Sequence, residues 1–371
     1  QRALSNNSVC YTEKPDMGIF MKEWLSLYES KSGERGIFNR ASAQEKAASN
    51  GRRDGDVDFG TNPCCEIILR PYQFCNLSEV ICRAEDTVAT LKEKIRLATI
   101  LGTFQSTLTD FGYLRKRWKD TTEEERLLGV SLTGIMDCPA VYNAKPETLQ
   151  ELRNMAVKTN KKLAEKLGIK QSAAVTCVKP SGTVSQLVDA ASGIHARHNP
   201  FYVRTVRGDN KDPLTMFLKD KGVPAEPDFT APDSVTVFSF PMKSPEGAVC
   251  RYDMSAIEQL ELWLKIADNY CEHKPSVTIS VKEHEWLAVG SWCWEHFDSL
   301  SGISFLPFSD HSYKQAPYQD IEKDIYGDMV KKMPPIIDWT ELQGYEKGDT
   351  TSGSQELACT GGVCEVVDIG A

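Results

Sequence analysis

The chain has 371 residues, a formal net charge of −9 and 26% charged residues. Its length allows one large domain or two ordinary ones, and its 41% hydrophobic content is ordinary for a globular protein. The acidic balance argues against a general nucleic-acid binder, which shows a basic bias, but it still allows a local basic pocket for phosphate. No apolar run approaches the about 18 residues of a membrane span, and no signal peptide is visible. We therefore expect a cytoplasmic protein.

The twelve cysteines are scattered along the chain. In a chain of this length without a signal peptide, that pattern does not indicate a secreted disulfide scaffold. Reduced thiols, a few of them redox-active, fit better. The chain starts at Gln1 rather than at Met, and we interpret it as a piece of a longer polypeptide.

Helical and extended patterns alternate along the chain. Residues 20–28, 87–118 and 146–167 have helical spacing, and Gly168 is a natural stop signal. Short strand patterns lie near 66–70, 75–81, 129–136, 173–178 and 302–306. This alternation predicts an α/β fold. Residues 208–250 are rich in Pro, Asp and Gly and predict a peripheral subdomain or lid, and residues 340–371 predict a flexible tail.

The stretch from Asn62 to Leu69 carries an amide, a thiol and a carboxylate at alternate positions: Asn62, Cys64 and Glu66. In an extended segment, alternate side chains point to the same side. Plain packing is the alternative, because free Cys is often buried. However, Asn62 and Glu66 are costly beside a buried Cys unless they bond to something. We therefore expect the three polar groups to face one point.

A second candidate site follows the strand pattern at 173–178. There Pro180-Ser181-Gly182-Thr183 leads into a helix start. Free N–H groups and the positive end of a helix bind anions, and Gly182 lets the backbone approach a ligand closely. A Ser or Thr at a helix start is also a common N-cap, so capping remains the alternative.

The end of the chain contains Cys359 and Cys364, separated by four residues in a Gly-rich segment. Two cysteines are too few for a structural zinc site, which needs four ligands. A dithiol shuttle that exchanges with a buried disulfide suits them better.

The string N-P-C-x-E-I-x-L, followed by C-N-L, resembles the active-site loop of ribonucleotide reductases. The resemblance implies that Cys64 carries a thiyl radical that abstracts the 3′-hydrogen of a ribonucleotide. It makes Asn62 a ligand of the ribose hydroxyls and Glu66 the general acid/base. Cys65 stands where relatives usually carry Gly or another small or apolar residue, and we expect it to point away from the substrate.

The same resemblance assigns further roles. Cys75 matches one half of the family's redox pair, whose other half lies in an N-terminal region that this chain lacks. Cys359 and Cys364 would re-reduce that pair and would then be reduced by a thioredoxin-like partner. The residues implied to bind the substrate phosphates are Ser181, Gly182, Thr183 and Ser185.

The resemblance also bears on the radical source. The chain has no Tyr-Tyr doublet, which is found in reductases fed by a separate metal subunit, and its tail shows no glycyl-radical motif with a zinc cysteine cluster. The tail pair and the string 314–318 resemble the monomeric ribonucleoside-triphosphate reductases, which use adenosylcobalamin (coenzyme B12). The implied fold is about half of a ten-stranded α/β barrel, of the ribonucleotide reductase and glycyl radical enzyme type, in residues 1–339. No metal site is expected.

Two other interpretations stay open. The chain could be an incomplete or split reductase half that is inactive without its N-terminal partner. It could also be a thiol redox or metal-binding module that uses Cys64 with Cys65 and Cys359 with Cys364. Addition of the missing portion tests the first interpretation, and a zinc titration tests the second.

Overall fold

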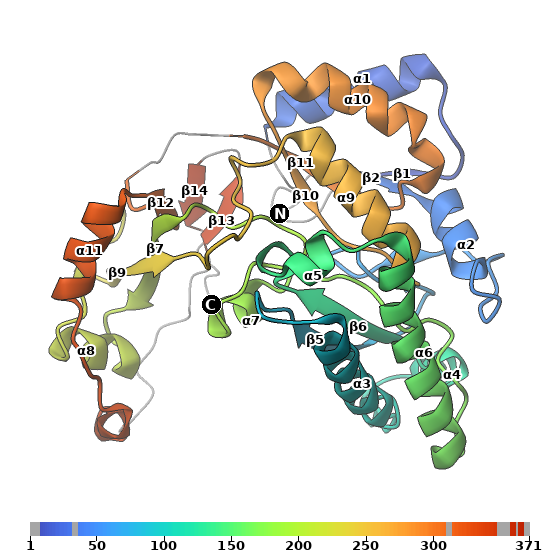
Figure 1. The fold of residues 1–371 in the computed structure, drawn as a ribbon, viewed down its shortest axis with the longest axis horizontal. Coiled ribbons are helices and arrows are strands. Elements are labelled where there is room, and N and C mark those ends of the chain that lie inside the picture. Colours follow the sequence, from blue (N-terminus) through green and yellow to red (C-terminus); the bar gives the residue numbers. More distant parts are fainter. Residues whose placement is uncertain (1–7, 32–35, 309–313, 347–356, 361–362, 367–371) are drawn as a thin grey trace.

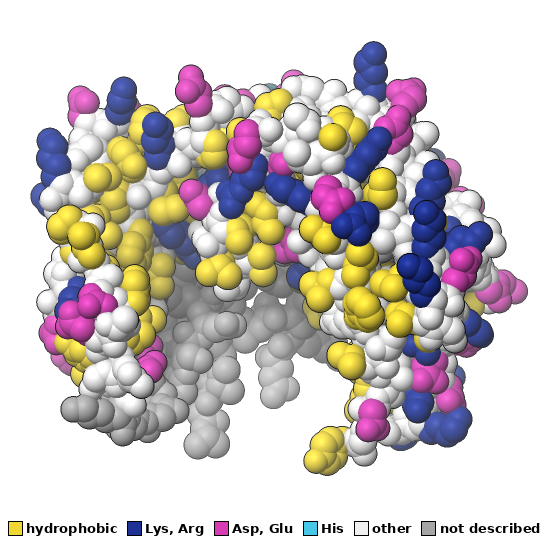
Figure 2. All heavy atoms as spheres, turned by 60° about the horizontal axis from the view of Figure 1, so that its bottom comes forward, with side chains coloured by type: hydrophobic (Ala, Val, Ile, Leu, Met, Phe, Trp, Pro, Cys, Tyr) yellow, Lys and Arg dark blue, Asp and Glu magenta, His cyan; other side chains and the backbone are white. Residues whose placement is uncertain are grey.

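The computed structural model describes residues 8–31, 36–308, 314–346, 357–360 and 363–366. Figure 1 shows two parts: a larger helix-covered body, and a smaller lobe that carries α8, α11, β7 and β9. In the described residues, no helix has the length and apolar character needed to cross a lipid bilayer. Lys and Arg side chains are interspersed with Asp and Glu over the face drawn in Figure 2.

Neighbouring strands form the wall of the larger body. Five of them are parallel, and the first pair, β5 and β6, is joined by single bridges through the extended segment 175–178 to β10 and β11. β11 then pairs with β2 in the opposite direction, and β2 pairs with β1. The strands in this order are β5 (Asn76–Ile81), β6 (Leu128–Thr133), 175–178, β10 (Thr278–Val281), β11 (Ile303–Pro307), β2 (Gly36–Asn39) and β1 (Val9–Tyr11).

Helices connect these strands and cover the outside of the wall (Figure 1). Two of them start with a reciprocal capping box, at Thr87 and at Ser255, which satisfies free N–H groups at the helix start. The longer helices of the body are α1 (Met17–Ser30), α2 (Arg40–Ala48), α3 (Val88–Gln105), α4 (Lys116–Glu125), α6 (Pro146–Leu167), α9 (Ala256–Asn269) and α10 (Trp286–Glu295).

The predicted helix over 146–167 is confirmed as α6, and it ends at Gly168 in a left-handed conformation. The single helix expected over 87–118 is wrong, because α3 ends at Gln105 and α4 begins at Lys116. The Ser106 hydroxyl donates to the Thr103 carbonyl at 2.7 Å, and the Thr107 hydroxyl donates to the Phe104 carbonyl at 2.7 Å. Such local side-chain bonds offer the backbone an alternative to helix continuation.

Helix α9 and the residue that follows it tie the strands together through two fully buried aromatic side chains. The Trp263 indole N–H donates to the Pro275 carbonyl at 2.8 Å, ahead of β10. The Tyr270 hydroxyl donates to the Val130 carbonyl of β6 at 3.0 Å. Each ring therefore contributes apolar area while its polar group is satisfied.

The smaller lobe is built on a separate sheet with the strand order β12-β7-β9-β8. β7 pairs with β9 from Phe201 to Asp209, so the predicted boundaries of 208–250 cut through a strand and are too narrow. The sheet also takes β12 from the C-terminal region, which no local pattern indicated. The elements of the lobe are β7 (Phe201–Asp209), α8 (Pro213–Asp220), β8 (Ala225–Pro227), β9 (Val235–Lys243), β12 (Tyr318–Asp320) and α11 (Lys323–Lys332).

The prediction that a flexible tail begins at residue 340 places its start too early. The short 3-10 helix η5 (Trp339–Gly344) packs on α8, where the rings of Trp339 and Tyr345 lie 5.6 Å and 5.4 Å from the ring of Phe217. Farther on, β13 (Leu357–Thr360) and β14 (Val363–Val366) pair antiparallel, with Cys359 and Cys364 as register partners.

Gly134 permits the turn that follows β6. Its φ is +77°, and a Cβ atom there would lie 2.4 Å from the Cys82 carbonyl oxygen. We expect Gly134→Ala to lower the free energy of unfolding by at least about 1–2 kcal/mol, because a left-handed conformation already costs a residue with a Cβ that much.

The control is Gly327→Ala in α11, where no atom outside the helix's own backbone lies within 4 Å of the added Cβ among the described residues. That variant should be more stable by about 0.5–1 kcal/mol, because glycine is unfavourable inside a helix. Urea unfolding followed by circular dichroism measures both changes. Equal effects of the two substitutions would contradict the assigned role of Gly134.

Candidate active site

The loop at 62–67 is a hairpin tip rather than the expected extended segment. It joins β3 (Gly60–Thr61) to β4 (Ile68–Leu69), which pair antiparallel. The Cys65 N–H donates to the Asn62 carbonyl at 2.9 Å, and Cys65 has a φ of +63°. The Ile67 N–H donates to Oδ1 of Asn62 at 3.0 Å. Because β3 and β4 run in opposite directions, the chain has to reverse here, and the Asn62 side chain closes that turn.

Backbone contacts fix this loop against the barrel strands. The Lys274 N–H donates to the Glu66 carbonyl at 3.2 Å. The Ile68 N–H donates to Nδ1 of His273 at 3.4 Å, and Nε2 of His273 lies 3.0 Å from the Leu128 carbonyl. Burial lowers the pKa of His273 to about 3. The neutral ring therefore accepts at one nitrogen and donates at the other, which links the loop to β6.

Although the loop turns between them, Cys64 and Glu66 both lie beside the side chain of Lys179. Nζ of Lys179 lies 3.8 Å from Sγ of Cys64 and 3.5 Å from Oε1 of Glu66. Lys179 follows the extended segment 175–178, and its own N–H donates to the Ser131 hydroxyl of β6 at 2.9 Å. The barrel thus brings a cation to the loop from more than a hundred residues away along the chain.

The Glu66 side chain is fully buried. Among the described residues, neither of its carboxylate oxygens has a hydrogen-bond partner. Lys179 is its ion-pair partner, and although burial lowers the pKa of Lys179, the charges of Glu66 and Cys64 outweigh that effect and raise it. A buried carboxylate without hydrogen bonds is costly. Its free lone pairs are therefore available to a ligand that carries hydroxyl groups.

The thiols near Glu66 are held in the protonated form. Burial raises the pKa of Cys64, and the nearby Lys179 cation opposes that shift only in part. Burial, followed by the charge of Glu66, raises the pKa of Cys75 as well. Cys75 lies just before β5 in a small apolar cluster with Ile67 and Cys177. At neutral pH both Cys64 and Cys75 therefore carry an S–H group.

Cys65 has different partners from its neighbour Cys64. Its Sγ accepts a hydrogen bond from the Thr61 hydroxyl at 3.3 Å. On its other side lies Lys274, which is almost completely buried and donates to the Ser301 carbonyl at 2.7 Å. A Cβ added to Gly302 would lie 2.1 Å from Nζ of Lys274 and 3.4 Å from Cβ of Cys65. Because Gly302 has no side chain, there is room beside it for the ammonium group of Lys274.

The predicted phosphate loop is divided between exposed and buried groups. Helix α7 (Gly182–Leu187) starts directly after Ser181, and Gly182, with a φ of +43°, and Thr183 are exposed. The Ser185 hydroxyl is buried and donates to the Gly182 carbonyl at 2.7 Å, and the Ser181 hydroxyl is bonded to the Thr133 hydroxyl. The structure thus directs two of the three predicted hydroxyl side chains, those of Ser181 and Ser185, into the protein.

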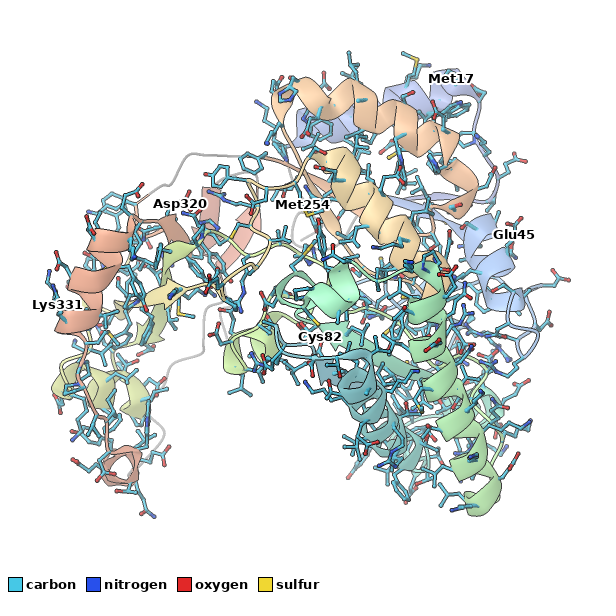
Figure 3. The ribbon with its side chains drawn as sticks, in the orientation of Figure 1. Met17, Glu45, Cys82, Met254, Asp320 and Lys331 are labelled. Carbon is cyan, nitrogen blue, oxygen red and sulfur yellow. The ribbon has the colours of Figure 1, made fainter. Side chains whose placement is uncertain are left out.

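A cleft of about 330 Å³ lies beside α7 and β10. His195, which lines it, is held between the Ser192 carbonyl at 2.9 Å and the Thr278 N–H at 3.1 Å, so both ring nitrogens are engaged. His198 lies 2.7 Å from Asp320 of β12, where the lobe meets the body (Figure 3). Other lining residues include Gln186, Tyr202, Met254, Gln259, Ser280 and Tyr318.

Sequence reasoning did not assign Lys179 or Lys274 to the site. Lys179 had a signal, because it is a charged residue at the end of a buried strand pattern, one position before the Pro-Ser-Gly-Thr string. Lys274 had none, since its position against the Cys loop depends on the pairing of segment 175–178 with the residues before β10.

Comparison with known proteins shows what this architecture resembles. No protein-family model matches the chain. An adenosylcobalamin-dependent ribonucleoside-triphosphate reductase from Euglena gracilis is 27% identical over 344 residues, which cover 90% of this chain and 46% of the relative. The reductases of the same name from Lactobacillus acidophilus and Levilactobacillus brevis are 27% and 24% identical and cover 84% and 95% of this chain. The chain is thus similar in sequence to these reductases over most of its own length.

Solved structures agree on the fold. The crystal structure of a B12-dependent class II ribonucleotide reductase matches with a TM-score of 0.78 at 24% identity, over 94% of this chain and 52% of that one. A class Id reductase α subunit from Actinobacillus ureae matches with a TM-score of 0.53 at 15% identity. The predicted half of a reductase-type α/β barrel is therefore confirmed. The chain spans about half the length of the reductases it matches.

We expect Lys274 to make the free energy of unfolding depend on pH. Burial lowers its pKa to about 8, against the charges of Cys65 and Glu66, which raise it. Between about pH 8 and about pH 10.4 the unfolded chain binds more protons than the folded one, so this lysine makes stability rise with pH by up to about 1.4 kcal/mol per pH unit. Below that window the lysine is charged in both states, and its burial penalty is complete.

We expect Lys274→Met to remove this rise. The free energy of unfolding, measured in urea at about pH 8 and about pH 10, should then depend less steeply on pH than in the unmodified protein. The control is Lys332→Met on α11, which is exposed and should leave the slope unchanged. An unchanged slope in Lys274→Met would show that Lys274 is not the titrating group.

Proposed function

We propose that this chain carries the thiyl-radical site of a ribonucleotide reductase, which replaces the 2′-hydroxyl of a ribonucleoside triphosphate with hydrogen. The observation that supports this most is the buried Glu66 carboxylate with no hydrogen bond among the described residues, next to the Cys64 thiol. A ribose offers two adjacent hydroxyl groups that can satisfy such a carboxylate. The homologous reductases act on ribonucleoside triphosphates, according to their names.

The proposed roles follow from the proton that Cys64 carries and from the contacts of the other side chains. Cys64 starts as S–H, so it can lose a hydrogen atom to become a thiyl radical and can then take the 3′-hydrogen of the substrate. Glu66 accepts the proton of the 3′-hydroxyl and returns it. Asn62 uses its amide oxygen to close the loop, which leaves its amide nitrogen to donate to a ribose hydroxyl. Lys179 is the ion-pair partner of Glu66 and holds its position beside the Cys64 thiol.

The reduction needs two electrons, which a pair of thiols provides. The 2′-hydroxyl leaves as water while two S–H groups become a disulfide, so atoms and electrons balance. Cys75 is one of these thiols, and the other comes from a further reductase segment. Cys359 and Cys364, which are register partners in the β13–β14 hairpin, re-reduce that disulfide by exchange and then receive electrons from a thioredoxin-like protein.

The substrate phosphates are proposed to bind at Gly182 and Thr183, which are the exposed part of the loop. Ser181 and Ser185 support its shape through their bonds to Thr133 and Gly182. The positively charged Lys179 lies two residues before this loop and favours an anionic ligand nearby.

The proposed cofactor is adenosylcobalamin, which when bound supplies the radical that Cys64 receives. The cleft beside α7 offers a test of fit. Its volume of about 330 Å³ is at the lower end of the range for small-molecule pockets, and its amides, hydroxyls and tyrosine rings suit a nucleoside. Gln186, Gln259 and Tyr318 would hold the adenosyl group there. The two lining histidines are already paired, so the cleft offers neither as a free cobalt ligand.

A further reductase segment is proposed as the partner of this half barrel. In the described residues, β5 and β1 each pair on one side only within the wall. Next to β5, the outer face of α3 leaves large apolar side chains exposed, among them Leu97, Leu101 and Phe104. These edges support the second candidate function, a reductase half that is inactive until its complement is present. We place the assembled enzyme in the cytoplasm.

The thiol assignment is tested by two matched substitutions. In the full chain combined with the complementary reductase segment and adenosylcobalamin, we expect Cys64→Ser to abolish ribonucleotide reduction, because serine cannot form a thiyl radical. Cys65→Ser should retain reduction, because Cys65 faces Thr61 and Lys274 instead of Lys179. Deoxyribonucleotide formation is the measurement, with nucleotide binding as the control. Turnover in Cys64→Ser but not in Cys65→Ser would reverse the assignment.

The tail assignment is tested by the double variant Cys359→Ser/Cys364→Ser. It should lose repeated turnover driven by a thioredoxin-type reductant, because the exchange step is missing. It should keep a single turnover from the pre-reduced enzyme, and it should keep cycling with dithiothreitol, which reaches the buried disulfide directly. Normal cycling with the protein reductant would show that the tail is no relay. Loss of the single turnover would place these cysteines in the chemistry itself.

A further inference from the structure

Glu79 places a second carboxyl group on the inner face of the barrel wall. It lies in the middle of β5, opposite Ser131 of β6 in the parallel register. Its neighbour Ser78 points the other way, because the Ser78 hydroxyl lies 3.5 Å from where a Cβ of Gly102 on α3 would be. Side chains alternate along a strand, so Glu79 faces away from α3 and into the barrel.

Polar groups connect Glu79 with the proposed reductase site. The hydroxyls of Ser131 and Ser181 neighbour its carboxyl group. Ser131 accepts the N–H of Lys179 at 2.9 Å, so its own proton remains free to be donated. Ser131 thus lies between Glu79 and the backbone of Lys179, whose side-chain Nζ pairs with Glu66. Ser181, at the start of the phosphate loop, borders Glu79 from another side.

The surroundings of Glu79 favour its neutral form. Oε1 is buried and has no hydrogen-bond partner among the described residues. Burial raises the pKa of Glu79 to about 7, and the charge of Glu66 acts in the same direction, while Ser181, Lys179 and Ser131 oppose it. Helix α3 packs on the opposite face of β5, and its Lys94 is paired with Asp86. Lys179 is therefore the cation that faces Glu79, and it is shared with Glu66.

We propose that Glu79 works in the nucleotide site as a neutral carboxylic acid that donates a hydrogen bond to the substrate polyphosphate. This inference rests on the proposed function, in which the phosphates lie at Gly182 and Thr183 beside Ser181. An ionised carboxylate next to that loop would repel a triphosphate, whereas a protonated one is a donor to an anionic oxygen. A carboxylic acid kept neutral at neutral pH by an apolar site is a known form of hydrogen-bond donor.

The proposal predicts a pH dependence of nucleotide binding. As the pH rises through about 7, Glu79 loses its proton, so it loses a donor and gains a charge that repels the ligand. Above that pH, affinity should fall by up to about tenfold per pH unit, because binding requires one proton. Glu79→Gln keeps a donor of the same shape and cannot ionise. It should bind as the unmodified protein does below pH 7 and should lose this fall.

The experiment measures the dissociation constant of CTP by calorimetry across this pH range for the full chain and its variants. The ionisation of CTP itself is common to all proteins, so the difference between the unmodified chain and Glu79→Gln isolates the contribution of Glu79. Thr183→Ala should weaken binding at every pH and keep the slope. Ser78→Ala, on the opposite face of β5, should leave affinity and slope unchanged.

A second measurement does not depend on the folding of a variant. In infrared difference spectra of the unmodified chain, the C=O stretch of a protonated carboxyl group should shift when CTP binds below pH 7 and should be lost above it. Equal slopes in the unmodified chain and in Glu79→Gln, or no shift of such a band, would overturn the role of Glu79 while CTP binding itself still supports the proposed function. No CTP binding at any pH would overturn the proposed function and this inference together.

Discussion

The ion pair between Glu66 and Lys179 is the interaction on which the site depends. A carboxylate that is fully removed from water costs several kcal/mol of free energy unless a partner compensates it. Here the compensation is a single lysine at 3.5 Å, and the hydrogen-bonding capacity of the carboxylate is left unused within the described residues. The hairpin loop, the segment 175–178 and the strand β6 all have to be in place for these two residues to meet. The fold therefore leaves an unsatisfied acceptor at the point where the proposed function places a substrate hydroxyl.

The adjacent residues Cys64 and Cys65 have different neighbours. The turn at Cys65, with its positive φ, separates the environments of the two thiols. Cys64 lies beside Lys179, whereas Cys65 accepts from Thr61 and borders Lys274. Sequence spacing already distinguishes the two thiols, because only Cys64 alternates with Asn62 and Glu66, and the structure adds a different lysine beside each of them. The different surroundings of the two sulfurs are thus decided by long-range packing around a short loop.

The inner and outer faces of the half barrel differ in polarity. Its inner face carries a line of polar residues, from Glu79 on β5 across β6 to Lys179 and Glu66, whereas its outer face is covered by apolar helix packing. Polar groups inside a barrel cost stability unless they bond to each other or to a ligand. In the proposed function, a bound nucleotide supplies the partners that these polar groups lack. Asp320 of the smaller lobe pairs with His198 and Arg251, which lie in the segments that lead into the lobe and back to the body.

The sequence by itself determined the α/β class, the 146–167 helix with its glycine stop, and the Asn-x-Cys-x-Glu and Pro-Ser-Gly-Thr strings, because these depend on local spacing and turn chemistry. Only the tertiary structure decided that Cys65 lies in a turn, that Lys179 reaches Glu66, and that the segment from 340 to 346 packs on α8. It also decided that the Ser185 hydroxyl points inward. Each of these features depends either on contacts between segments far apart in the chain or on a side chain that bonds to a backbone carbonyl. The hydrophobic periodicity of the sequence indicates neither kind of contact.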